Sequence, residues 1–236
     1  MATATRVTQQ LMYNVGGDRA MSSRDLATLQ TRELFEEHAV FYPLTVDAYH
    51  SLIENGSLPE GEPFELLGGH IVRKDRSEAG GGIMTVGHHH AWVVGELTAL
   101  SSRLERHGCH LRAQLPLAIA PNNEPEPDGL IVRGVNRDYQ DRHPSPADAS
   151  CVIEVAYNSL ARDRNSKMRA YAATGIACYI IINLVEKVIE VYSEPIHDPD
   201  GKSIYGRNGT FRPGDTIHFP TPAGENLTID VGSLLP

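Results

Sequence analysis

One acidic residue of this sequence lies where a charge is costly. Glu154 sits inside the apolar segment 151–156, CVIEVA, whose pattern predicts a strand buried on both faces. A lone buried carboxylate either takes up a proton or faces a cation. The segment therefore predicts a basic partner for Glu154.

The residues after this strand offer such a partner. Asn158 and Ser159 can each cap a helix, and Asp163, Lys167 and Tyr171 then recur four positions apart. This spacing predicts one helix face that brings a lysine back over the strand. An ordinary i, i+4 ion pair between Asp163 and Lys167 is the alternative interpretation.

Two further acids lie on predicted strands. Glu65 belongs to FELLGGHIVRK, which predicts two short strands around Gly68-Gly69, and Asp128 begins the strand DGLIVRG. Two carboxylates on adjacent strands can hold a hard cation such as Mg²⁺ and leave positions for water and a phosphate. With a lysine to orient the water or to stabilise the charge that builds on the phosphate, such a group could hydrolyse a phosphodiester. The alternative interpretation is that Asp128 has only a structural role, because Pro127-Asp128 is a common pair of residues in turns.

Three consecutive histidines, at positions 88 to 90, raise the question of a zinc site. Consecutive residues on a helix point in different directions, and the sequence contains no H-E-x-x-H motif. We therefore expect His88 and His89 at the surface.

Composition restricts the classes of function. Among 236 residues, 41% are hydrophobic and 22% are charged, as in ordinary globular proteins. The net charge of -9 argues against a protein that coats nucleic acid, although a small cleft can still be locally basic or hold a metal. Cys109, Cys151 and Cys178 form no C-x-x-C pair, so we expect buried, reduced packing residues.

The chain predicts a single domain over residues 41–236, with an extension over residues 1–40. The longest apolar run, 176–182, is far shorter than the roughly 20 residues that span a bilayer, and the first ten residues resemble no signal peptide. We therefore expect a cytoplasmic protein that does not associate with membranes.

Local patterns predict the remaining elements. We expect helices after Thr45 and from His88 to about His107, ended by Asn55-Gly56 and Gly108 respectively. We also expect a strand in LRAQLPLAIA and a central strand in IACYIIINL, with VEKVIEVYS as its hairpin neighbour. The other predicted features are a short helix near 23–37, a mobile glycine-rich loop over 77–87 and an irregular β appendage over the last forty residues.

Taken together, these segments resemble the Uma2 family, formerly a domain of unknown function, within the PD-(D/E)XK restriction-endonuclease-like nucleases. The resemblance spans about residues 44 to 235 and rests on six segments in family order: LTVDAYHSL, FELLGGHIV, HAWVVGEL, EPDGLIV, IEVAYNSLARDRNSKMRAYAATGIACYIIINL and VIEVY. It implies an α/β (α+β) fold with a mixed β-sheet flanked by helices, a restriction-endonuclease-like core and irregular C-terminal β hairpins.

The resemblance also implies roles for particular residues. Asp128 and Glu154 would hold Mg²⁺ or Mn²⁺, Lys167 would be the basic residue, and Glu65 an accessory acid. The superfamily pattern places its lysine two residues after the second acid, where this chain has Ala156. In this family the lysine is expected on the following helix, and Asp163-x-x-x-Lys167 matches that spacing.

Two accessory positions complete the predicted site. Of the three histidines only His90 matches a family position, and Tyr171 is expected to pack with its hydroxyl at the edge of the site. The leading hypothesis is a metal-dependent endonuclease acting on DNA as a homodimer. The alternatives are a catalytically silent interaction module that binds nucleic acid or protein, and a zinc hydrolase that uses the histidines.

Overall fold

The computed structural model describes residues 42–59, 62–74 and 87–236. The chain divides into two units, 1–42 and 43–236, and the account below concerns the second. The predicted extension over residues 1–40 lies outside the described residues. So do the predicted helix near 23–37 and, apart from Gly87, the predicted glycine-rich loop.

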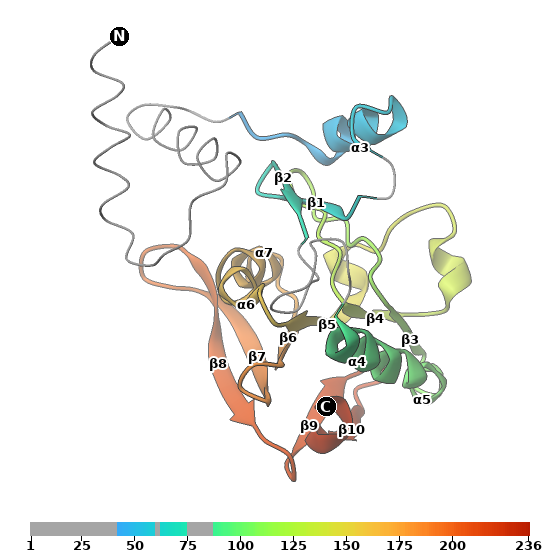
Figure 1. Cartoon of the computed structure of the whole chain (residues 1–236), viewed down its shortest axis with the longest axis vertical. Helices are drawn as coiled ribbons and strands as arrows, with labels where there is room; N and C mark the ends of the chain where they lie inside the picture. The colour runs from blue at the N-terminus through green and yellow to red at the C-terminus, as the bar shows by residue number, and fades with distance from the viewer. Residues whose placement is uncertain (1–41, 60–61, 75–86) are drawn as a thin grey trace, which may run out of the picture. The chain divides into compact units, whose positions relative to one another are not determined.

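A mixed β-sheet of six strands forms the centre of the described unit (Figure 1). β5 and β6 are parallel neighbours, and every other pair in this sheet is antiparallel. All of β6 and most of β5 are buried, as their continuous apolar sequences predict. In spatial order the strands are β3 (Cys109–Arg112), β4 (Gly129–Arg133), β5 (Ala149–Ala156), β6 (Cys178–Asn183), β7 (Val188–His197) and β8 (Ser203–Phe211).

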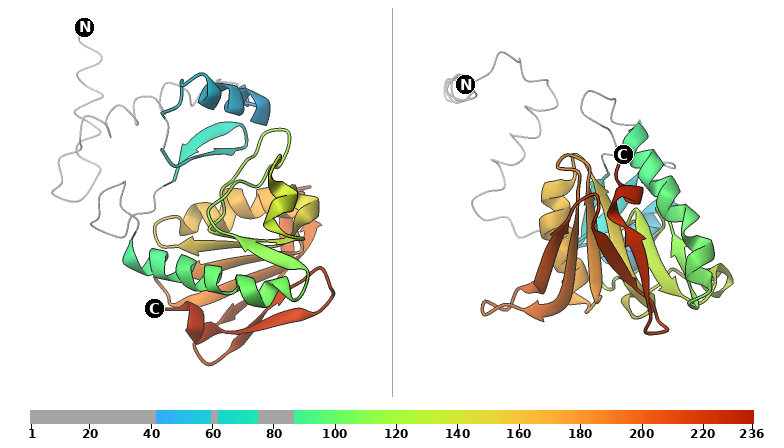
Figure 2. Two further views of the ribbon diagram at one scale, coloured as in Figure 1. Left: turned by 90° about the vertical axis from the view of Figure 1, so that its right-hand side faces the viewer. Right: turned by 90° about the horizontal axis from the view of Figure 1, so that it is seen from below.

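Helices cover both faces of this sheet, which confirms the predicted fold class (Figure 2). On one face lie α4 (His88–Ala99) and α5 (Ser101–Glu105), whose apolar residues pack with the odd-numbered residues of β5. On the other lie α6 (Leu160–Arg162), a π-helix (Asp163–Lys167) and α7 (Met168–Ala173), which pack with the even-numbered residues. Glu154 therefore faces α7.

A helix and a hairpin precede the sheet in the chain. Thr45 caps α3 (Val46–Glu54) as predicted, because its hydroxyl accepts the Ala48 N–H at 3.2 Å. β1 (Phe64–Leu67) and β2 (His70–Arg73) pair around Gly68 and Gly69, which have φ angles of +58° and +78°. A side chain at Gly69 would meet Pro43 and the Leu44 amide, so glycine is required there by both φ and space.

The C-terminal strands divide between two sheets. β8 is one edge strand of the main sheet, whereas β9 (Thr216–Pro220) and β10 (Asn226–Asp230) form a separate hairpin followed by a short 3-10 helix (Val231–Leu234). This hairpin packs on the α4 face of the sheet through its apolar side chains. The predicted appendage is thus confined to β9 and β10.

Two predicted elements differ from the structure. The helix expected from His88 to His107 is interrupted at Leu100 and ends at Glu105, followed by a turn to Gly108, which has a φ of +68°. The strand expected in LRAQLPLAIA stops at Arg112, and Gln114 has a φ of +54°. Leu117 and Ile119 are nevertheless buried on the α7 face of the sheet. Their apolar pattern reflects a loop that packs on the sheet, not a strand.

The cysteine prediction is confirmed, because Cys109, Cys151 and Cys178 are buried and free. The Cys151 and Cys178 sulfurs lie 3.3 Å apart on neighbouring strands. Within the described ranges, no helix combines the length and the apolar character that crossing a membrane would require.

Candidate active site

Glu154 has the basic partner that its burial requires. The Lys167 ammonium lies 2.9 Å from Glu154 Oε1, and the Tyr171 hydroxyl donates to the same oxygen at 2.8 Å. The Glu154 side chain is 3% exposed and that of Lys167 is 1% exposed. The strand and the following helical segment thus bring a carboxylate and a lysine together within the core.

The helical segment that carries Lys167 is not a regular α-helix. Asp163–Lys167 form a π-helix between α6 and α7, a feature often found at functional sites. Asp163 and Lys167 are both buried, and Asp163 Oδ2 accepts a hydrogen bond from Ser159 at 2.6 Å. Lys167 contacts Glu154, and its charge also opposes the rise in the pKa of Asp163 that burial causes, so the interactions of Lys167 extend beyond an i, i+4 ion pair.

Glu65 approaches the same lysine from the β1–β2 hairpin. Its Oε2 lies 3.1 Å from Lys167 Nζ and 3.4 Å from the Glu126 amide nitrogen, which donates to it. Its other oxygen, Oε1, is buried and has no hydrogen-bond partner within the described part of the chain. Lys167 therefore lies between two buried carboxylates, one of which keeps a free acceptor.

Asp128 directly precedes β4, on the strand next to Glu154. The register that pairs Gly129 with Ile153 brings Asp128 level with Glu154, and the Val155 N–H donates to Asp128 Oδ2 at 2.9 Å. His90 Nε2 lies 3.2 Å from the same oxygen. Asp128 therefore faces the interior beside Glu154.

Lys74, for which no role was predicted from the sequence, also contacts Asp128. Its ammonium lies 3.8 Å from Asp128 Oδ1 and donates to the Glu126 carbonyl. Strand alternation offers a signal that could have identified it: Val72 pairs with Glu65, so Lys74, two residues further on, lies on the same face of the hairpin. Gln114 is a second residue without a sequence signal, and it donates to Asp128 Oδ1 at 3.3 Å.

The two acids have pKa values shifted in opposite directions. Burial raises the pKa of Glu154 to about 7, although Lys167 opposes this shift. Burial alone would also raise the pKa of Asp128, but Lys74, His90 and the Val155 N–H together hold it well below the ordinary value. Asp128 is therefore a carboxylate at neutral pH, whereas Glu154 exchanges a proton there.

The charge on Lys167 is also fixed by its surroundings. Burial alone would lower the pKa of its ammonium, but the neighbouring carboxylates, chiefly Glu154 and Glu65, raise it above the ordinary value. Lys167 remains a cation over the physiological range. The cluster thus contains a permanent positive charge beside an acid that titrates near neutrality.

The structure gathers all seven predicted site residues in one buried cluster, which Lys74 joins. They are Glu65, His90, Asp128, Glu154, Asp163, Lys167 and Tyr171. Their roles remain predictions. His88 and His89 are exposed as expected, with ring centroids 4.0 Å apart, whereas His90 is buried against Asp128.

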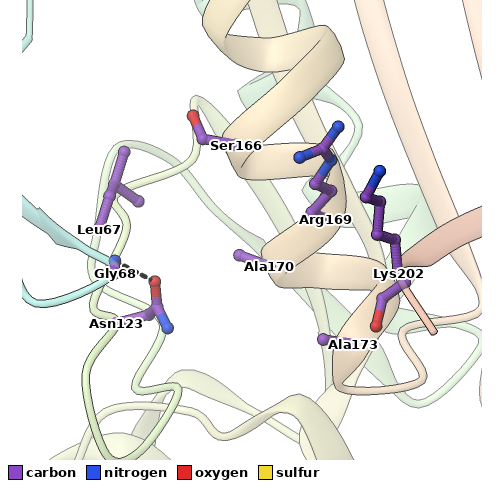
Figure 3. Close-up of a pocket in the computed structure, with 9 residues that line it drawn as sticks. Leu67, Gly68, Asn123, Ser166, Arg169, Ala170, Ala173 and Lys202 are labelled. Carbon is purple, nitrogen blue, oxygen red and sulfur yellow. Dashed lines mark hydrogen bonds between the residues drawn. The ribbon is translucent and has the colours of Figure 1, made fainter. Parts of the chain in front are cut away.

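A pocket of about 360 Å³ lies on another side of α7 (Figure 3). Ser166, Arg169 and Lys202 contribute polar groups to its wall, and Figure 3 shows the Arg169 and Lys202 side chains extending alongside each other. The opposite wall is the β1–β2 turn, where the Gly68 N–H donates to Asn123 Oδ1 at 2.7 Å. The turn that begins three residues after Glu65 and the helical segment that carries Lys167 thus enclose a locally basic pocket.

A mixed sheet flanked by helices, with acids and lysines grouped beside its central strands, is the architecture of the restriction-endonuclease-like nucleases. The family model described as Uma2, "Putative restriction endonuclease", matches residues 46–232. The chain belongs to the Uma2 family, as its sequence segments predicted.

A solved structure supports the same fold. The chain is similar to a protein from Anabaena variabilis ATCC 29413 whose crystal structure is described as that of "a putative nuclease belonging to DUF820". The two are 15% identical with a TM-score of 0.55, and the similarity covers 81% of this chain and 97% of the other. Comparison with curated proteins gives no significant match.

Proposed function

We propose that this protein is a metal-dependent endonuclease that hydrolyses phosphodiester bonds of DNA. The observation that carries the proposal is the 2.9 Å contact between Lys167 Nζ and Glu154 Oε1 beside Asp128 on the adjacent strand. Membership of a nuclease family supports nucleic acid as the substrate. Restriction-endonuclease-like proteins cut duplexes, and two strands require two sites or two passes, so we propose a homodimer.

Asp128 and Glu154 are the residues that would hold Mg²⁺ or Mn²⁺. Carboxylate oxygens are the ligands that these hard cations prefer, and the buried Glu65 Oε1 offers a further acceptor. A bound cation would polarise the phosphate and lower the pKa of an attacking water. The donor set therefore fits the metal that the family implies.

The remaining residues would prepare these groups. Lys167 stays cationic and would stabilise negative charge that develops on the phosphate, while Glu65 holds its ammonium in place. His90 and the Val155 N–H fix Asp128, and Tyr171 fixes Glu154 through its hydroxyl. Deprotonation of Glu154 near pH 7 would supply a second carboxylate charge, beside that of Asp128, for an entering cation.

Plasmid cleavage in Mg²⁺ or Mn²⁺ tests the proposal. Asp128→Asn and Glu154→Gln should each lower the rate by about a hundredfold or more, and Lys167→Met by about 10²- to 10³-fold. Glu186→Gln is a matched control, since Glu186 is an exposed carboxylate in the turn after β6. Equal cutting by Glu154→Gln and the wild type would refute the assignment, and an RNA substrate run in parallel distinguishes the two nucleic acids.

A second candidate, the catalytically silent module, is favoured by a specific observation. Lys74 and Lys167 already neutralise Asp128 and Glu154 within a buried cluster, so the acids are satisfied without a metal. Calorimetry separates the candidates. The nuclease predicts Mn²⁺ binding that Asp128→Asn abolishes, whereas the silent module predicts no binding and no cleavage.

A further inference from the structure

A second cluster of potential ligands lies apart from the proposed nuclease site. His50 on α3, Glu124 in the loop before β4 and His143 in the loop before β5 each offer one ligand atom, and these atoms all lie within 4.8 Å of one another. His50 Nε2 is 2.8 Å from Glu124 Oε1, and the two imidazole ring centroids are 6.3 Å apart. Three segments distant in sequence therefore converge at this point.

Glu124 is the buried member of the cluster. It is 4% exposed, and its Oε2 has no hydrogen-bond partner within the described residues. Its backbone is fixed, because Glu124 and Leu66 exchange N–H to carbonyl hydrogen bonds of 2.8 and 3.2 Å. A buried carboxylate oxygen without a partner is costly, and a cation between Glu124 and the imidazoles would satisfy it.

The same three residues line a pocket of about 560 Å³. Arg112 and Arg142 also line it, and each guanidinium lies within 5.4 Å of the Tyr139 ring centroid. The pocket leaves space beside the His50–Glu124–His143 cluster for water or a small anion. The arginines would favour an anion over a neutral molecule.

We propose that His50, Glu124 and His143 form a Zn²⁺ site whose remaining coordination position faces this pocket. Two imidazoles and one carboxylate suit zinc, whereas Mg²⁺ prefers oxygen ligands alone. Three protein ligands leave a fourth position open for water or an anion. The ion would fasten α3 to the loops that contain Glu124 and His143.

The competing account is an ordinary ion pair between a protonated His50 and Glu124, with His143 merely nearby. It requires no metal, so zinc would not stabilise the fold through these residues. The zinc site predicts instead that binding of the ion and the free energy of unfolding are coupled, because the ligands converge only in the folded chain.

Zinc titration of the full-length, chelator-treated protein tests the proposal. The experiment uses the Asp128→Asn/Glu154→Gln background, which removes the other carboxylate pair and makes the result independent of nuclease activity. We expect one Zn²⁺ per chain by calorimetry. At a hundredfold excess over Kd, the melting temperature should rise by about 5–10 °C.

Single substitutions in the same background assign the ligands. Glu124→Gln and His143→Ala should each remove the zinc-induced shift, as should His50→Gln, whose side chain is already 40% exposed in the wild type. His218→Ala, which removes an exposed imidazole from β9, should keep the full shift. The metal-free melting temperature of each variant shows whether it is folded before zinc is added.

Three results would overturn the proposal. The first is a melting temperature that zinc leaves unchanged in the background protein. The second is an undiminished shift in both His50→Gln and Glu124→Gln, which would place the ion elsewhere. The third is an equal shift with Mg²⁺, which would point to oxygen ligands alone.

Discussion

The ammonium of Lys167 lies 3.1 Å from Glu65 and 2.9 Å from Glu154, and all three side chains are buried. Lys167→Met would leave carboxylates in the core without their cation, which costs about 3–5 kcal/mol of unfolding free energy. Urea denaturation measures this loss. Lys187→Met, at an exposed turn position, should change the stability by less than about 0.5 kcal/mol.

A compensating change separates charge from packing. In Lys167→Met/Glu154→Gln one of the unpaired acids is also neutralised, so part of the lost stability should return. A double variant that is no more stable than Lys167→Met would contradict the interpretation that an unpaired charge causes the loss.

The raised pKa of Glu154 predicts how stability depends on pH. The folded protein keeps this proton up to about pH 7, whereas the unfolded chain loses it near the ordinary value of 4.5. Because the folded state binds the proton more tightly, the unfolding free energy should fall as pH rises from about 4.5 to 7 and then level off, by up to about 3 kcal/mol. Urea denaturation at pH 5 and 7.5, with a chelator present, measures the change.

Glu154→Gln is the reference for this experiment, since its side chain does not titrate. The difference in unfolding free energy between the wild type and the variant should shrink or reverse from pH 5 to pH 7.5, and a constant difference would contradict the prediction.

Asp128 has the opposite effect on the pH dependence of stability. Its lowered pKa stabilises the fold at neutral pH, and that stabilisation is lost as pH falls below about 4 toward the folded-state value.

At the scale of elements, the β1–β2 hairpin depends on its turn. Gly69 has a φ of +78°, and an added Cβ would lie 2.8 Å from the Leu44 amide nitrogen and closer still to Pro43. Gly69→Ala should therefore be destabilising beyond the roughly 1–2 kcal/mol that a left-handed alanine costs. It should also lower the proposed nuclease activity, because this hairpin carries Glu65 and leads into Lys74.

Gly56→Ala is the matched control for that substitution. Gly56 has a φ of +73°, but open space surrounds the position of its Cβ. Thermal unfolding of both variants therefore isolates the effect of the close approach at Gly69. Equal losses of stability in the two variants would show that the positive φ alone explains why position 69 requires glycine.

Much of the element pattern is predictable because local signals agree with tertiary burial. The apolar segment around Glu154 predicted both β5 and the need for a cation, and Gly68-Gly69 predicted the hairpin. Residues 113–120 were wrongly predicted as a strand, because a loop that packs on a sheet can have the same apolar alternation as a strand. Periodicity records burial, and it does not record backbone hydrogen bonding.

The candidate site was less completely predictable. Lys74 meets Asp128 across 54 positions of sequence: strand alternation places Lys74 on the face of Glu65, but it does not identify Asp128 as the partner. The π-helix at Asp163–Lys167 was also missed, since a spacing of four predicts an α-helix and the widened turn arises where Lys167 reaches Glu154 and Glu65. Both features depend on the packed fold.

At the scale of the whole molecule, a net charge of -9 repels a polyanionic substrate. Binding of DNA would then depend on local basic groups, and Arg169 and Lys202 on the pocket beside α7 are the pair we select. Arg169→Glu/Lys202→Glu should weaken binding and lower the slope of log affinity against log salt concentration by about 2. Fluorescence anisotropy with labelled DNA over a salt series measures this slope.

Lys187→Glu, in the exposed turn between β6 and β7, is the control for charge alone. If it weakens binding as strongly as the double variant, the effect is one of net charge and not of the pocket. An unchanged slope in the double variant would show that these two side chains do not contact phosphates.

The parallel pairing of β5 and β6 affects the order in which the elements of the site unfold locally. Parallel neighbours need a crossover, and here the crossover is the helical segment that carries Lys167 and Tyr171. Amide protons of these two central strands should exchange with deuterated water most slowly, and those of the two-stranded β1–β2 hairpin earlier. Local opening would then release Glu65 from Lys167, while Glu154 keeps its contacts with Lys167 and Tyr171.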